Sequence, residues 1–165
     1  MGRTYAPDAH HAYEFDDLSP QELIAAWRTV ATTPWWWWKL PPLTDCWARI
    51  DALTKERPVY FVTARNVGTP EVLFQTASWL RCMGVENPCV IRTEMKGILA
   101  GVLRAGWMLD DEPSHIHAAR EEHTGITAVL LARPYNRLAQ GDVIHSGGHI
   151  VSSVEQFLGM VQTRG

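Results

Sequence analysis

Short apolar runs alternate with amphipathic stretches along the chain from Pro58 to its end. The runs are rich in β-branched and aromatic residues and stop at polar ones, as is typical of strands that are buried on both faces. The stretches between them have apolar residues at helical spacing and capping residues at their starts. We therefore expect strands at residues 59–63, 89–92, 106–109 and 126–131.

Helices are expected between and after these strands. They cover residues 69–83, 94–104, 113–123 and 152–162. Strands that alternate with helices at this spacing predict an α/β fold with a doubly wound, Rossmann-like parallel sheet. Open sheets of this kind bind ligands at the carboxyl ends of their strands.

The first third of the chain has a different pattern, helical and irregular. Ser19-Pro20-Gln21-Glu22 is a capping box with proline at the first helical position, which predicts a helix over residues 20–31. A second helix is expected over residues 43–54, after the Pro41-Pro42 pair. With neither an internal repeat nor a low-complexity linker, the sequence predicts one domain, residues 1–165, whose α/β core covers residues 57–165.

Composition and charge exclude several classes of protein. A chain of 165 residues with 46% hydrophobic content can bury a core, and its net charge of −3 does not favour a nucleic acid polymer or an anionic membrane. No apolar run reaches membrane-spanning length. The three cysteines, Cys46, Cys82 and Cys89, lack zinc-ligand spacing and indicate reduced thiols, so we expect a cytoplasmic protein.

Three positions at or after the predicted strands carry candidate chemistry: Thr63, Lys96 and the pair Asp110-Asp111. Two adjacent carboxylates repel each other unless a cation lies between them, and a hard, oxygen-seeking cation such as Mg²⁺ suits them. Each residue also has an ordinary explanation. Acidic residues favour the start of a helix, threonine often ends strands, and a lysine on a helix is usually solvated.

The order and spacing of these residues are more informative than any one of them alone. Val-Tyr-Phe-Val-Thr63, then Lys96, then Trp-Met-Leu-Asp110-Asp111 resembles motifs two, three and four of the haloacid dehalogenase (HAD) superfamily of phosphohydrolases. Two further segments resemble its 5′(3′)-deoxyribonucleotidase branch. They are Pro-Trp-Trp-Trp-Trp-Lys-Leu-Pro-Pro-Leu at residues 34–43 and Ala-Arg-Pro-Tyr-Asn at residues 132–136. The resemblance covers roughly residues 15–165.

The resemblance implies a role for each matching residue. Thr63 and Lys96 would be catalytic, one bonding the transferring phosphoryl group and the other balancing its charge. Asp110 and Asp111 would hold Mg²⁺. A nucleoside monophosphate or phosphate would be the ligand, bound by Arg65, Asn136 and the tryptophans Trp35, Trp36, Trp37 and Trp38, some of which would stack on the base. The tryptophans would lie in a reduced helical cap, residues 15–42, where packing of the cap on the core is the alternative role for at least two of them.

One family feature has no counterpart in this sequence. Family members open with an apolar strand that ends Asp-x-Asp-Gly and supplies the nucleophile. Residues 1–14 contain no such run, and Asp16-Asp17 leads directly into the capped helix. We therefore expect the first central strand to be missing, between the strands that carry Thr63 and Asp110. A partner chain or residues 3–6 could fill that position, and exchange of this arm would produce a homo-oligomer.

Three hypotheses follow. The first is a catalytically impaired HAD-like domain that binds phosphate, a nucleotide or a partner. The second is an active Mg²⁺-dependent 5′(3′)-deoxyribonucleotidase, a phosphoric monoester hydrolase whose nucleophile strand lies upstream of this chain or is supplied otherwise. The third is a non-catalytic structural or interaction protein with a tryptophan-rich surface. The missing motif favours the first, because covalent catalysis needs that carboxylate.

Overall fold

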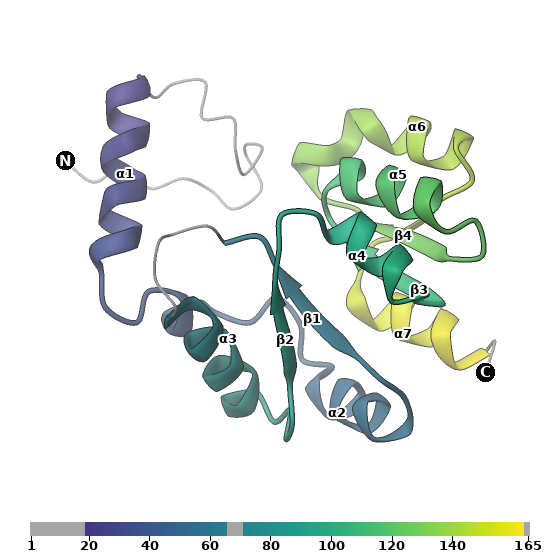
Figure 1. Cartoon of the computed structure of the whole chain (residues 1–165), viewed down its shortest axis with the longest axis horizontal. Coiled ribbons are helices and arrows are strands. Elements are labelled where there is room, and N and C mark those ends of the chain that lie inside the picture. Colours follow the sequence, from purple (N-terminus) through teal and green to yellow (C-terminus); the bar gives the residue numbers. More distant parts are fainter. Residues whose placement is uncertain (1–18, 66–70, 164–165) are drawn as a thin grey trace. The chain divides into compact units, whose positions relative to one another are not determined.

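The computed structural model describes residues 19–65 and 71–163 (Figure 1). The described residues form two compact units. Unit 1 contains residues 19–23 and 97–157, and unit 2 contains residues 24–65, 71–96 and 158–163. Three of the described helices run from one unit into the other: α1 (Pro20–Thr32), α4 (Lys96–Val102) and α7 (Val154–Thr163).

Unit 1 is built on a parallel three-stranded sheet in the order β3 (Trp107–Asp110), β4 (Thr127–Leu131) and β5 (His149–Val151). Residue Asp110 of the first strand pairs with Leu130 of the second, and Leu130 pairs with Ile150 of the third. A helix follows each strand. The elements of unit 1 are β3 (Trp107–Asp110), α5 (Pro113–Glu122), β4 (Thr127–Leu131), η2 (Pro134–Ala139), α6 (Gln140–His145) and β5 (His149–Val151), together with α4 (Lys96–Val102) from Gly97 onward.

The core of unit 1 lies where α5 packs on β3 and β4. The central strand β4 buries Ala128, Val129 and Leu130 in succession, as expected of a strand that is covered on both faces. The buried apolar cluster around it consists of Ala100, Ile116, Ala119, Ile126, Ala128, Leu130 and Val143. This cluster holds the carboxyl ends of the strands and the start of α5 in place.

Unit 2 is built on a parallel pair, β1 (Tyr60–Thr63) and β2 (Cys89–Arg92), with α3 (Glu71–Cys82) packed on β2 (Figure 1). Its other elements are α2 (Trp47–Glu56) and the short helix η1 (Trp37–Lys39), which packs on α3. The indole N–H of Trp79 donates to the carbonyl of Leu40 at 2.7 Å, and its ring meets Trp47 edge-on at 5.2 Å. The contact with Leu40 attaches the tryptophan segment, residues 35–40, to α3, and the contact with Trp47 attaches α2.

The expected α/β class with parallel strands between helices is confirmed, since all three strand pairings are parallel. The four expected strands are present with ends within one residue of the predicted ones. The capping box is confirmed as well: the backbone N–H of Ser19 donates to Glu22 Oε2 at 2.8 Å, and that of Glu22 to Ser19 Oγ at 3.3 Å. The strands are distributed over two sheets, β1-β2 and β3-β4-β5.

The structure corrects some of the other expectations, and the rest concern residues outside the described ranges. The helix expected over residues 43–54 begins only at Trp47, because Thr44 Oγ1 accepts the backbone N–H of Cys46 in a turn before it. The helix expected over residues 94–104 is confined to α4, so Lys96 is its first residue. Residues 3–6, Asp16, Asp17 and the start of the helix expected at residue 69 lie outside the described residues.

Two elements, α6 and β5, were not expected from the sequence, and neither was the short helix η2. They are short, and β5 is only three residues long, so no periodicity can develop within it. Within the parts of the chain that the structure describes, no helix has the length and apolar content needed to cross a membrane.

Candidate functional site

The adjacent carboxylates lie at the carboxyl end of β3, in unit 1. Asp110 is the last residue of the strand and is 9% exposed. Its Oδ1 accepts the backbone N–H of Glu112 at 3.0 Å and lies 3.1 Å from Nδ1 of His115. Asp111, the next residue, accepts the hydroxyl of Tyr135 at Oδ2. Each carboxylate is thus held by a side chain from a different element, α5 or η2.

Parallel pairing explains why these side chains meet. Because β3 and β4 run in the same direction and Asp110 pairs with Leu130, both strands end at the same edge of the sheet. The chain leaves β4 through the Ala-Arg-Pro-Tyr-Asn segment, which brings Tyr135 to Asp111. At the end of β3, Glu112 caps α5 by accepting the N–H of Ser114 at 3.4 Å, which begins the helix that carries His115.

Asn136 joins the two loops at this edge. The residue is 2% exposed, and its Nδ2 donates to the carbonyls of Asp111 at 2.8 Å and Leu131 at 2.9 Å. Its Oδ1 accepts the backbone N–H of Arg133 at 2.9 Å and Nε2 of Gln140 at 3.2 Å. All four of these bonds are made to other residues of the protein, so they give the side chain a structural role. Binding of substrate by Asn136 stays a prediction.

The donor set at Asp110 and Asp111 is compatible with Mg²⁺. This cation is usually held by one or two carboxylates and keeps several of its waters. Among the described residues, no group of three or more His, Cys, Asp or Glu side chains is placed to hold a metal ion. A structural zinc site needs four such ligands and a catalytic one three, so the described residues fit a water-rich Mg²⁺ site better.

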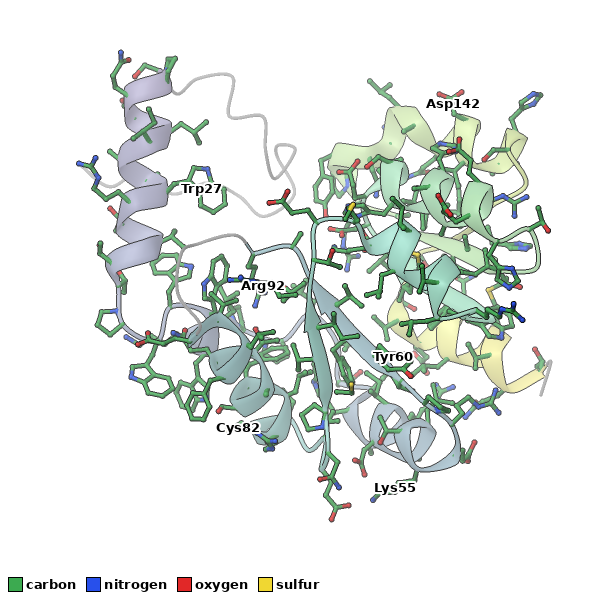
Figure 2. All side chains as sticks on the ribbon, in the orientation of Figure 1. Trp27, Lys55, Tyr60, Cys82, Arg92 and Asp142 are labelled. Atoms are coloured by element: carbon green, nitrogen blue, oxygen red, sulfur yellow. The ribbon has the colours of Figure 1, made fainter. Side chains whose placement is uncertain are left out.

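A second group of predicted residues lies in unit 2, at the carboxyl end of the β1-β2 sheet. Thr63 ends β1 and pairs with Arg92 at the end of β2, and Figure 2 labels Arg92 there. The carbonyl of Thr63 accepts the N–H of Thr93 at 3.0 Å, and its hydroxyl accepts the N–H of Arg65 at 3.4 Å. Lys96 follows β2 and begins α4.

Arg65 lies on a tryptophan. Its guanidinium carbon is 4.4 Å from the centre of the Trp37 ring, within the range of a cation–π interaction, and Nη1 donates to Thr76 Oγ1 at 3.5 Å. The backbone N–H of Trp37 in turn donates to Oε1 of Gln75, a buried residue of α3, at 3.2 Å. Arg65, one of the predicted substrate-binding residues, is therefore in contact with Trp37, another of them.

The four consecutive tryptophans have different surroundings. Trp37 is half-buried beneath Arg65, whereas Trp35, Trp36 and Trp38 are exposed. Trp35 has a positive φ of 58° and meets the exposed ring of Phe74 edge-on at 5.9 Å. The contacts thus support a packing role for Trp37. The indoles of Trp35, Trp36 and Trp38 are exposed and accessible to a ligand.

The predicted residues are brought together in two groups, one in each unit. Unit 1 gathers Asp110, Asp111 and Asn136, and unit 2 gathers Thr63 and Arg65 with Trp37. Two contributors were missed. The sequence predicts no role for Tyr135 beyond its place in the Ala-Arg-Pro-Tyr-Asn motif, and His115 has no sequence signal beyond its place in the first turn of a capped helix.

Comparisons of the chain with models of protein families, with curated proteins and with solved structures found no match.

Proposed function

We propose that this chain is a HAD-like, 5′-nucleotidase-related domain that binds Mg²⁺ and the phosphate of a nucleoside monophosphate and has little catalytic activity. The observation that supports it best is that Thr63 and Asp110 each close a parallel strand at the carboxyl end. Open α/β sheets bind their ligands at such ends. The proposal includes the finer fold, a doubly wound sheet with a cap at residues 15–42.

Different residues bind the metal ion, the phosphate and the base. Asp110 and Asp111 hold Mg²⁺, with water in its remaining positions. Thr63, Arg65 and Lys96 bind the phosphate, through a hydroxyl and two cations. Exposed indoles of the tryptophan segment stack on the base, where aromatic surface accepts any base, while Trp37 supports Arg65 from below. When bound, Mg²⁺ would offset the repulsion between the two adjacent carboxylates.

Weak catalysis follows from the sequence. No Asp-x-Asp pair occurs anywhere among the 165 residues, and Asp110-Asp111 is an adjacent pair. Without an attacking carboxylate, positioning and electrostatics supply what catalysis is left.

Ligand binding should be visible as thermal stabilisation. We expect MgCl₂ with inorganic phosphate or dTMP to raise the melting temperature by about 3–5 °C at ten times Kd, since binding to the native state then contributes about 1.4 kcal/mol. Asp110→Asn should remove the part that depends on Mg²⁺, and Lys96→Ala should reduce the part that depends on phosphate. Differential scanning fluorimetry with each ligand alone and with both measures this.

Matched controls for these two variants are Asp142→Asn and Lys55→Ala. Both residues are exposed, and Figure 2 labels them in α6 and α2. Neither substitution should change the ligand-dependent shift, whatever it does to the melting temperature itself. A wild-type curve that is indifferent to millimolar Mg²⁺ and phosphate would contradict the proposal and favour a structural or interaction protein.

Hydrolysis is expected to be slow. Release of phosphate from dUMP or dTMP with Mg²⁺ should be on the order of 10⁴-fold or more below a typical kcat of about 10 s⁻¹, because the covalent step lacks its nucleophile. A colorimetric phosphate assay measures it. Robust turnover that Asp110→Asn abolishes and Asp142→Asn does not would support the active deoxyribonucleotidase instead. Loss of that turnover in Asp8→Asn or Asp16→Asn would identify the nucleophile.

A further inference from the structure

His115 and Tyr135 each contact one carboxylate of the Asp110-Asp111 pair. His115 Nδ1 lies 3.1 Å from Oδ1 of Asp110, and the Tyr135 hydroxyl bonds to Oδ2 of Asp111. An ionised carboxylate only accepts hydrogen bonds, so the imidazole and the phenol are the donors. Each carboxylate therefore has one oxygen engaged by a ring, and the two rings come from different elements.

The His115–Asp110 contact is well supported by its surroundings. The imidazole is 19% exposed and the Asp110 side chain 7%, so water competes little for the bond. The same Oδ1 also accepts the backbone N–H of Glu112 at 3.0 Å. The backbone N–H of His115 donates to the carbonyl of Glu112 at 3.1 Å, within the first turn of α5. Two donors on one oxygen set the torsion of the carboxyl group.

Orientation of this kind matters for a small, hard cation. Mg²⁺ demands nearly ideal octahedral geometry, so the direction in which a carboxylate presents its oxygens affects affinity. Groups that hydrogen-bond to ligating carboxylates fix that direction, and their loss typically weakens metal binding about 10–100-fold. Without such donors, the terminal torsion of an aspartate is broad and roughly two-fold.

We propose, on the basis of the Mg²⁺-binding function proposed above, that His115 and Tyr135 are positioning residues that hold Asp110 and Asp111 in the orientation that receives the cation. The imidazole acts through Nδ1. The histidine is thus a donor to the carboxylate and is not itself a ligand, and the tyrosine has the same role toward Asp111.

Amide substitutions separate this role from mere packing. The amide nitrogen of asparagine can occupy the place of Nδ1, whereas that of glutamine reaches the place of Nε2. We expect His115→Asn to keep the Kd for MgCl₂ within about three-fold of the wild type. His115→Gln and His115→Ala should weaken it about 10–100-fold, and Tyr135→Phe, which removes only the hydroxyl, about ten-fold. Isothermal titration calorimetry measures these constants.

The control is His117→Gln, a change two residues further along α5 that should leave the Kd for MgCl₂ as it is. Circular dichroism spectra identify any variant that fails to fold. The asparagine and glutamine variants then decide the matter even if His115→Ala is unfolded. Glutamine and phenylalanine variants that bind MgCl₂ like the wild type would overturn the positioning roles and leave the proposed function intact. A wild type that shows no binding of MgCl₂ would overturn both.

Discussion

Replacing Asn136 by alanine is expected to lower the free energy of unfolding by about 3 kcal/mol, which corresponds to a fall of about 6–12 °C in melting temperature. The residue is 2% exposed, and its amide makes four hydrogen bonds, two of them to the carbonyls of Asp111 and Leu131. Alanine would remove all four bonds, and polar groups that lose their partners in a part-buried site are costly. Urea denaturation and thermal melting measure the change.

Leu138→Ala is the matched control, because Leu138 belongs to the same short helix, η2, and is 98% exposed. It should change stability by less than about 0.5 kcal/mol. The pair also tests the role that the resemblance implies for Asn136. If Asn136→Ala kept wild-type stability but lost affinity for a nucleotide, the residue would be a substrate ligand, and its four bonds would be incidental to folding.

The elements that the sequence predicted well are those with a long local signal. The capping box at Ser19 and Glu22 marks the start of α1 without help from the rest of the chain. The apolar runs that end at Thr63 and Asp110 are strands because β-branched and aromatic residues favour the extended conformation. Their positions at strand ends are confirmed, while their chemical roles stay predictions.

The partners at the carboxylate pair depend on pairing between distant strands. Tyr135 reaches Asp111 only because β3 and β4 are parallel and Asp110 is paired with Leu130. A shift of this register by one residue would exchange the faces of the strand, and the register is fixed by packing between strands that are distant in sequence. Hydrogen bonds of this kind could not be predicted from the chain alone.

The tryptophan run shows a different limit. Four identical side chains in succession have the same propensities, so the sequence cannot say which of them is buried. The choice is made by residues far along the chain: Gln75 accepts the backbone N–H of Trp37, and Arg65 lies on its ring. These contacts assign Trp37 to packing and leave its neighbours exposed.

A methyl group added at Gly97 should also destabilise the protein strongly. A Cβ atom there would lie 2.6 Å from the carbonyl oxygen of His115, 2.7 Å from Cβ of Ala118 and 2.7 Å from the backbone nitrogen of Ala119. Two of these atoms belong to the backbone of α5 and cannot move away by a change of rotamer, so α4 and α5 must move apart. We expect Gly97→Ala to cost about 2 kcal/mol, since overpacking outweighs the better helix propensity of alanine. Thermal and urea melting measure it.

Gly159→Ala is the control with the opposite expected sign. Gly159 lies in the middle of α7, and a Cβ atom there would meet nothing within 4 Å. Alanine should therefore stabilise the protein by about 0.5–1 kcal/mol, because it favours the helix and restricts the unfolded chain. Because the Gly97 contact involves the carbonyl of His115, Gly97→Ala should also displace the imidazole from Asp110 and weaken binding of MgCl₂, which Gly159→Ala should not do. Equal stability of the two variants would contradict the close packing of α4 against α5.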